Sequence, residues 1–431
     1  MYRGILNNRE KERTFMELFK VRNIEKRINQ LFYSVFCFYL FLATFNNTFR
    51  RVIGNIYSLD ALVVHCIYIL MIIPVILIVV RRLNFKNVLF MFILFVCLVF
   101  SMFNNSDAEI TRKIITTFAL TCLPAYVFGN AIVDFQGILD GLWKISWFVL
   151  IMLFLNVVAI GTMGTIKSDH SLAYYSLFAA SVFLVSIFNK ASVFFSVIGF
   201  LIAMVMMVLS NTAGALFSIA VCLILLLCNL IFSTKSIKKV ILLIFIIIMI
   251  IIVVINIQSI LFWSISILDK LGVNSAVVTE IWSGSTTSDR YRESIYKYVW
   301  EYSKEHLFWG SGIGYDRVLI SQNTLVSLQS KFGNYAHNIF LEFMMQFGLI
   351  PGIFISFFNI WYIIKGFIQE CDNEQRMVLI ILCTIGIIPL MVSSTYIGHS
   401  YYFALLGYLS ACKREKNLLR FEWDREELEL G

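Results

Sequence analysis

Charged residues are scarce in this sequence. Asp, Glu, Lys and Arg make up 14% of the 431 residues, whereas 59% are hydrophobic; a soluble domain carries roughly 25% charged residues. This imbalance excludes a water-soluble fold, because a single core stops growing at about 250–300 residues. The run from Val240 to Ile257 contains no charge and is long enough to cross roughly 30 Å of hydrocarbon. Because a backbone in lipid must satisfy its own hydrogen bonds, such runs predict membrane-spanning helices.

Acidic residues are scarcer than basic ones, but the formal charge of +8 does not indicate a nucleic-acid partner. Eight of the 35 Lys and Arg lie in residues 1–28 and five lie in residues 413–431, and the others punctuate the gaps between apolar runs. Nucleic-acid binding would need a basic patch instead. The distribution follows the positive-inside rule and predicts that both termini are cytoplasmic.

Metal-ligating patterns are also lacking. The nine cysteines form no CxxC pair and the five histidines are scattered, so no metal-ligand spacing is found. We expect the cysteines to be small apolar packing residues. No nucleotide-binding loop is found either, and we expect the protein to use no metal and no cofactor.

The apolar runs predict an all-α polytopic membrane protein with about twelve transmembrane helices and one large extracytoplasmic loop. If successive spans cross the membrane in opposite directions, Lys and Arg concentrate in the segments that lie on the cytoplasmic side. The chain divides into a cytoplasmic tail (1–28), nine spans (29–266), the outer loop (267–336), a broken re-entry helix with three further spans (337–412), and a second cytoplasmic tail (413–431). The predicted spans are 29–45, 60–80, 88–103, 114–130, 141–160, 170–188, 191–209, 213–232, 240–266, 347–367, 377–394 and 399–412.

The outer loop carries patterns that predict local structure. Apolar residues recur at spacings of three and four in 289–304, which predicts a helix with Ser288 as its N-cap. The segment Gly310–Gly314 lacks the GxGxxG spacing of dinucleotide sites, and we interpret it as a flexible turn. A further helix begins at His337-Asn338 and is interrupted in Gly348–Gly352, before the tenth span.

Long structured loops are usually functional, and this one brings several reactive side chains to one face of the membrane. A guanidinium suits pyrophosphate, because its charge is fixed and its donors form a bidentate fork. Imidazole is the usual general base near neutral pH. For each Arg the alternative is an ordinary solvated side chain, and for His306 it is an exposed helix cap. The candidates are Arg290, Arg292, His306, Arg317 and His337.

Three segments together resemble the O-antigen polymerase and O-antigen ligase family. That family shows an Arg before an amphipathic helix, a turn similar to PLFGxGxG, and HN followed after nine residues by GxxG. The resemblance is fairly specific as a combination and spans residues 288–352. The matching segments here are Ser288-Asp-Arg290-Tyr-Arg292, then Tyr298 through Leu307-Phe-Trp-Gly310-Ser-Gly312-Ile-Gly314, and then His337-Asn338 followed after nine residues by Gly348.

The resemblance implies a metal-independent glycosyltransferase of GT-C-like architecture in the bacterial inner membrane. As a polymerase it would transfer the growing glycan from undecaprenyl pyrophosphate to the next lipid-linked repeat unit. It implies catalytic roles for His337 and Arg290, and substrate contacts for Arg292, Arg317 and Asn338. The implied partners are the undecaprenyl-pyrophosphate-linked oligosaccharide, membrane lipid, a chain-length regulator and a flippase.

The sequence departs from the family pattern at three places. Leu307 replaces the usual Pro before the turn, and Pro351 is inserted in the final motif. Family members often carry Ser-Arg near the middle of the chain, where this sequence reads Asn211-Thr-Ala-Gly214. One phosphate-binding charge is therefore either missing or supplied elsewhere, by Arg292 or Arg317.

Two alternatives stay open. An O-antigen ligase would share the donor but use the lipid A core as acceptor, and the sequence barely separates the two. A lipid-linked oligosaccharide flippase belongs to a different class. It should show short loops and polar groups spread over the spans, whereas the polar groups here concentrate in one outer loop.

The predicted orientation can be tested by thiol labelling in a variant without native cysteines. We expect a cysteine at Ser321, in the outer loop, to react with an impermeant reagent in intact spheroplasts, and a cysteine at Ser236 to stay unlabelled. The reverse pattern would place the 267–336 loop inside and would contradict the functional interpretation as well.

Overall fold

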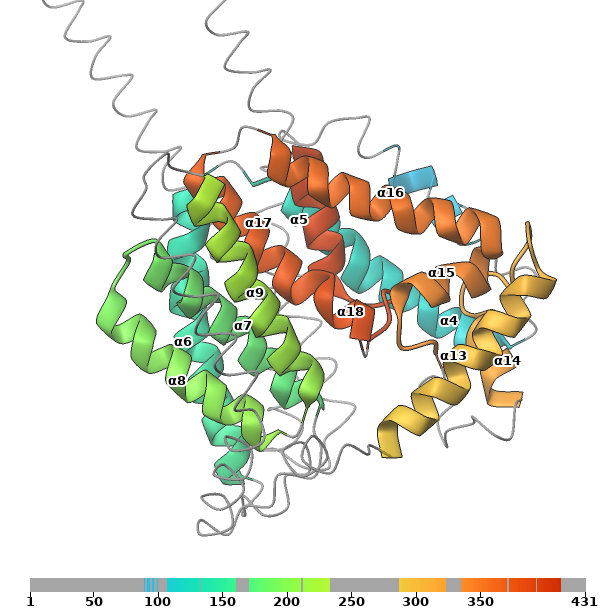
Figure 1. Ribbon diagram of the computed structural model, residues 1–431, viewed down its shortest axis with the longest axis horizontal. Coiled ribbons are helices and arrows are strands. Elements are labelled where there is room, and N and C mark those ends of the chain that lie inside the picture. Colours follow the sequence, from blue (N-terminus) through green and yellow to red (C-terminus); the bar gives the residue numbers. More distant parts are fainter. Residues whose placement is uncertain are drawn as a thin grey trace, which may run out of the picture.

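The structure, a computed structural model, describes the chain from Leu89 to Ala411 with gaps (Figure 1). The predicted spans at 29–45, 60–80 and 240–266 and both tails lie outside the described residues. The described residues are 89, 91–93, 95–96, 99, 107–132, 134–159, 170–210, 212–232, 287–322, 335–369, 372–392 and 394–411.

Every regular element among these residues is a helix, so the predicted all-α class is confirmed for the described part. The helices are α4 (Ala108–Thr117), the π-helical turn η1 (Phe118–Cys122), α5 (Leu123–Asn130), α6 (Phe135–Ala159), α7 (His170–Phe188), α8 (Val193–Leu209), α9 (Ala213–Phe232), α13 (Thr287–Glu305), α14 (Tyr315–Gln322), α15 (Ile339–Phe347), α16 (Leu349–Ile368), α17 (Asn373–Gly386), α18 (Ile388–Val392) and a last helix at 400–411.

Several of these helices can cross a membrane. Three are long and apolar enough to do so: Phe135–Leu155 in α6, Leu349–Ile368 in α16, and Asn373–Val392, which joins α17 and α18. Shorter apolar stretches lie in α7, α8 and α9. These helices support a multi-pass membrane protein, whereas the predicted number of twelve spans depends partly on residues outside the described part.

Helices α6 to α9 pack side by side as an apolar bundle (Figure 1), and α7 contacts α6, α8, α9 and α17. Burial explains the composition of α7, since a helix that is apolar all round is usually enclosed by others. Phe178 and Phe183 on α7 are fully enclosed, whereas Phe194 and Val205 on α8 are exposed. The exposed apolar residues of α8 are suited to contact lipid.

Polar side chains tie helix ends together at the end of the bundle that the sequence predicts to be cytoplasmic. The Asn130 amide, at the end of α5, donates a hydrogen bond to the Ser410 hydroxyl (2.6 Å). Asn229 near the end of α9 donates to Asn373 (3.3 Å) and accepts from Arg376 (3.4 Å), both in α17. The predicted inner ends of these four helices therefore lie together in two pairs.

Helix α13, in the predicted outer loop, is slightly longer than predicted. It begins at Thr287, two residues earlier than predicted, so Ser288 lies in its first turn and is not its N-cap. Its apolar stripe is real: Ile295 and Val299 are fully buried. They belong to a small core that is separate from that of the bundle and includes residues of the predicted outer loop. Its other buried members are Ile320, Ala336 and Met345.

The glycine-rich segment after α13 forms a turn, as predicted, and the broken helix holds it through backbone hydrogen bonds. The break falls at Gly348, as predicted, between α15 and α16. The last carbonyls of a helix have no partner within it. Here the amide of Ser311 donates to the Met345 oxygen (2.8 Å), and the amide of Gly312 donates to the Gln346 oxygen (2.9 Å).

The same segment satisfies the start of α16. The amide of Leu349 donates to the His306 oxygen (3.0 Å), and the amide of Ile350 donates to the Leu307 oxygen (2.9 Å). Pro351 is the third residue of α16, where its missing N–H would have had no helical partner. The segment 306–312 therefore bonds both sides of the break, because the two helix ends expose the groups that it can pair.

We predict that Gly310→Ala destabilises the protein. An added Cβ would lie 2.4 Å from the Met345 oxygen and 2.5 Å from the Gly348 nitrogen, both backbone atoms that cannot swing away. Overpacking of this kind costs about 1–3 kcal/mol, so the thermal unfolding midpoint of detergent-purified protein should fall. Gly141→Ala, inside α6, is the matched control and should unfold at or above the native temperature. Equal midpoints for the two variants would contradict the docking described above.

Candidate functional site

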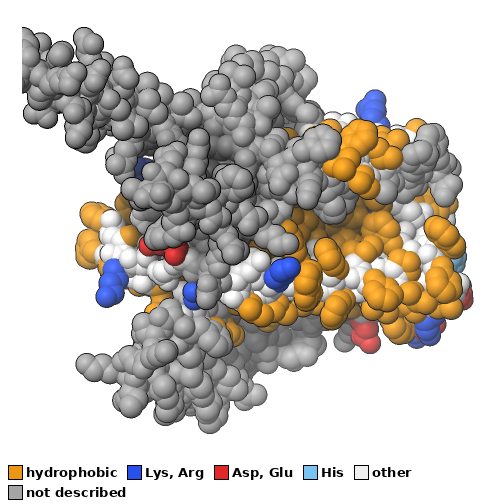
Figure 2. All heavy atoms as spheres, turned by 90° about the horizontal axis from the view of Figure 1, so that it is seen from above, with side chains coloured by type: hydrophobic (Ala, Val, Ile, Leu, Met, Phe, Trp, Pro, Cys, Tyr) orange, Lys and Arg blue, Asp and Glu red, His pale blue; other side chains and the backbone are white. Residues whose placement is uncertain are grey.

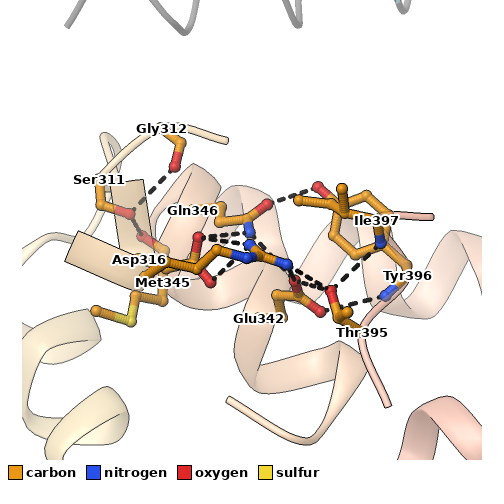
Figure 3. Close-up of polar contacts among 10 residues, drawn as sticks. Ser311, Gly312, Asp316, Glu342, Met345, Gln346, Thr395, Tyr396 and Ile397 are labelled. Atoms are coloured by element: carbon orange, nitrogen blue, oxygen red, sulfur yellow. Dashed lines mark hydrogen bonds and ion pairs between the residues drawn. The ribbon is translucent and has the colours of Figure 1, made fainter. Parts of the chain in front are cut away.

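A buried network of charged and polar side chains joins α14, α15 and the segment before the last helix (Figure 3). Asp316, Arg317 and Glu342 each have no exposed surface. Arg317 Nη1 lies 3.3 Å from Asp316 Oδ1, and Nη2 lies 3.7 Å from Glu342 Oε1. Arg317 Nη2 also donates to the Thr395 hydroxyl (3.0 Å), which in turn donates to Glu342 (2.6 Å). One guanidinium thus holds two carboxylates from different helices.

Gln346 and Tyr396 complete the network. The Gln346 amide nitrogen donates to Asp316 (2.9 Å) and to Glu342 (3.3 Å), while its oxygen accepts from the Tyr396 hydroxyl (2.5 Å). Both ends of this amide are therefore used, and its orientation is fixed by donors and acceptors on opposite sides. The network acts as a clamp that sets α14 against α15 and against residues 395–397.

The balance of charge within the network is unequal, because two carboxylates face one guanidinium. Burial raises the pKa of Asp316, which lies in the outer region, although Arg317 and the Gln346 amide act in the opposite direction. If both carboxylates were ionised, the buried network would carry a net negative charge away from water. The network is therefore suited to retain a proton on its carboxylates.

Tyr335 connects this clamp to His337. The Tyr335 ring lies 5.8 Å from the Arg317 guanidinium carbon and 4.2 Å from the His337 ring. His337 is half-buried and has a positive φ of 53°. Non-glycine residues rarely adopt this region, and they do so mainly where the surroundings impose it, often at functional sites. The imidazole is thus placed by its neighbours at the edge of the clamp.

Asn338, and not His337, caps the helix that follows. The Asn338 side-chain oxygen accepts from the amides of Phe340 (3.0 Å) and Leu341 (3.3 Å), and its nitrogen donates to the Met391 oxygen (3.0 Å). Because both ends of the side chain are used, Asn338 fixes where α15 begins. The capping role therefore belongs to Asn338, and His337 takes no part in it.

Arg292 lies on the face of α13 that turns inward. It is half-buried and shares that face with Ile295 and Val299. It lies within electrostatic range of Tyr174, near the start of α7, as does Tyr335. Arg292 and Tyr335, whose ring contacts His337, therefore both lie near Tyr174 but belong to separate segments.

The other predicted site residues differ in outcome. Arg290 lies in the first turn of α13, and its side chain is outside the described part of the structure; position 290 shares its face with the exposed Ser294 and Lys297. Arg317 has no exposed surface, so this arrangement gives it a clamping role and does not support direct contact with substrate. His306 is half-buried at the end of α13, where its Nδ1 lies 2.9 Å from the Tyr302 oxygen and its ring stacks on Tyr302. The predicted exposed cap is thus a packed one.

Sequence reasoning missed the acidic members of the clamp. Glu342 and Gln346 are four residues apart in the otherwise apolar α15, so they share one face of that helix. Ionisable residues in apolar helices usually line a functional interior, and this signal could have found them. Asp316 had no such signal, because it lies in the polar outer loop.

The described part of the chain contains no candidate metal site. There, no three His, Cys, Asp or Glu side chains lie close enough to hold a metal ion. Three of the described cysteines, Cys122, Cys222 and Cys383, are buried and unbridged, as expected for packing residues.

Comparison with known families gives the site a context. Residues 198–357 match the family model described as O-antigen ligase. The chain contains an O-antigen ligase family domain. The matched range extends from α8 into α16 and contains Arg292, Arg317, His337 and Glu342. Members of the O-antigen ligase family are bacterial membrane enzymes that transfer glycans, and their substrates are lipid-linked glycans. No curated protein sequence matches the chain.

We predict that Arg317→Met lowers stability strongly, since it leaves Asp316 and Glu342 buried without their cation. Removing one partner of a buried ion pair lowers the free energy of unfolding by about 3–5 kcal/mol. The loss should appear as a reduced protein level and a lower unfolding midpoint. Lys297→Met, on the exposed face of α13, is the control. The triple change Arg317→Met, Asp316→Asn, Glu342→Gln should recover part of the loss. A midpoint for Arg317→Met equal to that of the control would refute the clamp.

Proposed function

We propose that this protein is a surface-polysaccharide polymerase of the O-antigen type. It transfers a growing glycan from undecaprenyl pyrophosphate to the next lipid-linked repeat unit, at the outer face of the bacterial inner membrane. The observation that carries the proposal is that the His337 ring lies 4.2 Å from Tyr335, and that Tyr335 and Arg292 both lie within electrostatic range of Tyr174. Arg292, Tyr335 and His337 all fall inside the range that matches the O-antigen ligase family. The clamp behind Tyr335 holds this arrangement in place.

The chemistry follows from these two side chains. The hydroxyl oxygen of the acceptor sugar attacks the anomeric carbon of the donor, and the bond from that carbon to the pyrophosphate oxygen breaks. Arg292, assisted by Arg290, neutralises the charge that develops on the leaving pyrophosphate. His337 orients the acceptor hydroxyl and takes its proton, a contribution of roughly 10²–10⁴-fold. Cleavage of the pyrophosphate ester drives the reaction, so the scheme needs neither a nucleotide nor a metal.

The first alternative is a ligase with the lipid A core as acceptor. It would use the same donor and the same Arg292 and His337, so the site itself does not separate the two. The flippase alternative lacks a role for the His337 position, because transport needs no general base. A chain-length regulator and a flippase would be the natural protein partners of a polymerase.

We expect His337→Ala and His337→Gln to be present at normal levels but to leave only single, unpolymerised repeat units. A cap-deficient control is Asn338→Ala, which should lower stability by about 1 kcal/mol and reduce polymer in proportion to protein level. Polysaccharide ladders on gels give the readout. Long polymer made by His337→Ala would rule out the proposed role. Single units ligated normally to the lipid A core by native protein, with no chain extension, would favour the ligase.

We expect Arg292→Ala to abolish polymer formation and Arg292→Lys not to restore it, because an ammonium lacks the bidentate fork. Arg290→Ala and Arg290→Lys should behave in the same direction. Lys297→Ala, one turn further along α13 and exposed, is the control for a general loss of outer-loop charge. Normal ladders from Arg292→Ala at normal protein level would show that this guanidinium is merely solvated.

A further inference from the structure

Three consecutive apolar residues stand out on the surface of the outer region. Leu307, Phe308 and Trp309 are 45%, 61% and 85% exposed. Single exposed apolar residues are common, but a contiguous exposed group usually marks an interaction surface. The proposed transfer reaction makes no use of these side chains.

This tripeptide is mounted rigidly on the start of α16. The Leu307 oxygen accepts from the amide of Ile350, and the His306 oxygen just before it accepts from the amide of Leu349. An added Cβ at Gly348 would lie 2.8 Å from the Phe308 carbonyl carbon and 2.9 Å from the Trp309 nitrogen. The backbone of 307–309 therefore runs directly against the helix break, and its side chains are held out from the protein.

The tripeptide is also continuous with a surface of α16 that is suited to lipid. Exposed apolar residues follow α16 at spacings of three and four along its whole length, and Figure 2, which views the molecule from the side of α16, shows hydrophobic side chains over much of the described surface. Ile350, whose amide donates to the Leu307 oxygen, lies one turn before the first of these exposed apolar residues. The exposed members are Ile353, Phe354, Phe357, Phe358, Ile360, Trp361, Ile364 and Ile368.

The length of α16 sets where the tripeptide falls in a bilayer. Its 20 residues, at about 1.5 Å each, span about 30 Å, which equals the hydrocarbon thickness. At the far end Lys365 lies 4.6 Å from the centre of the Trp361 ring, a pairing typical of the inner membrane–water boundary. With that end at one boundary, residues 307–309 lie at the other, where Trp and other aromatic residues are enriched.

We propose that Leu307, Phe308 and Trp309 form an anchor that inserts into the headgroup region of the outer lipid leaflet. The partner is bilayer phospholipid, recognised by its interfacial polarity. The anchor fixes the depth of the segment 306–312, and through it the position of α13, α15 and His337 relative to the membrane surface. This deepens the proposed function, because the pyrophosphate of a lipid-linked donor lies at that same depth.

The depth can be measured without any enzymatic turnover. In a variant without native cysteines, a fluorophore is attached to Trp309→Cys, and the protein is reconstituted into phosphatidylcholine and phosphatidylglycerol vesicles. Quenching is compared for lipids with a nitroxide on the headgroup, lipids with a nitroxide deep in the acyl chain, and aqueous iodide. Phe357→Cys, midway along α16, and Lys297→Cys, on the exposed face of α13, are the two references.

We expect position 309 to be quenched most strongly by headgroup nitroxide, position 357 by acyl-chain nitroxide and position 297 by iodide. Quenching of position 309 by iodide alone, by acyl-chain nitroxide as strongly as at 357, or by none of the three would overturn the anchor. As a second readout, Leu307→Ser, Phe308→Ser and Trp309→Ser combined should leave the unfolding midpoint unchanged and lower polymer yield several-fold. Because quenching needs no activity, a correct depth with an inactive protein would count against the proposed function and not against the anchor.

Discussion

The arrangement of the outer region depends on one buried cation. The Arg317 guanidinium, with no exposed surface, faces Asp316 from its own helix and Glu342 from α15, and reaches Thr395 near the last helix. Moving such charges out of water is costly unless each finds its partners in good geometry. The three segments can therefore meet in few ways, and the one that satisfies the guanidinium, the two carboxylates and the Gln346 amide at once is the one observed.

A second set of hydrogen bonds joins backbone groups on the two sides of the helix break to the segment 306–312. Breaking a helix at Gly348 exposes carbonyls on one side and amides on the other, and in an apolar setting unpaired backbone groups are unfavourable. The segment 306–312 supplies partners for both sides. The side-chain clamp holds α15 through Glu342 and Gln346, and the backbone docking holds its last carbonyls. The Asn338 cap fixes the start of α15, directly after His337. Rigid mounting of this kind is what a transfer site needs if it is to orient an acceptor hydroxyl.

Much of this could be predicted from the sequence, and the exceptions have physical causes. Apolar runs identified α6 to α9 and α16, since spacing and composition are local properties. The break at Gly348 was readable because glycine and proline interrupt an apolar run there. The turn at Gly310–Gly314 could be predicted from its glycines, but the hydrogen bonds that hold it could not, because its partners lie more than thirty residues away in α15. Arg317 was predicted to contact substrate, and its burial could not be foreseen for a similar reason. Burial of a residue in a polar segment is set by tertiary contacts, and the sequence of Tyr315–Gln322 gives no sign of it.

The central claim is that the surface around Tyr335, beside His337, receives the lipid-linked glycan. A photo-reactive benzoylphenylalanine at position 335 tests it directly, because the substitution keeps an aromatic ring where Tyr335 stands. The same group at Phe367, which lines a cleft of about 420 Å³ at the predicted inner end together with Leu225 and Arg376, gives the comparison. On irradiation of cells that make labelled lipid-linked repeat units, the account predicts that label crosslinks to the protein at position 335 and not at position 367. Label captured at 367 and absent at 335 would contradict it.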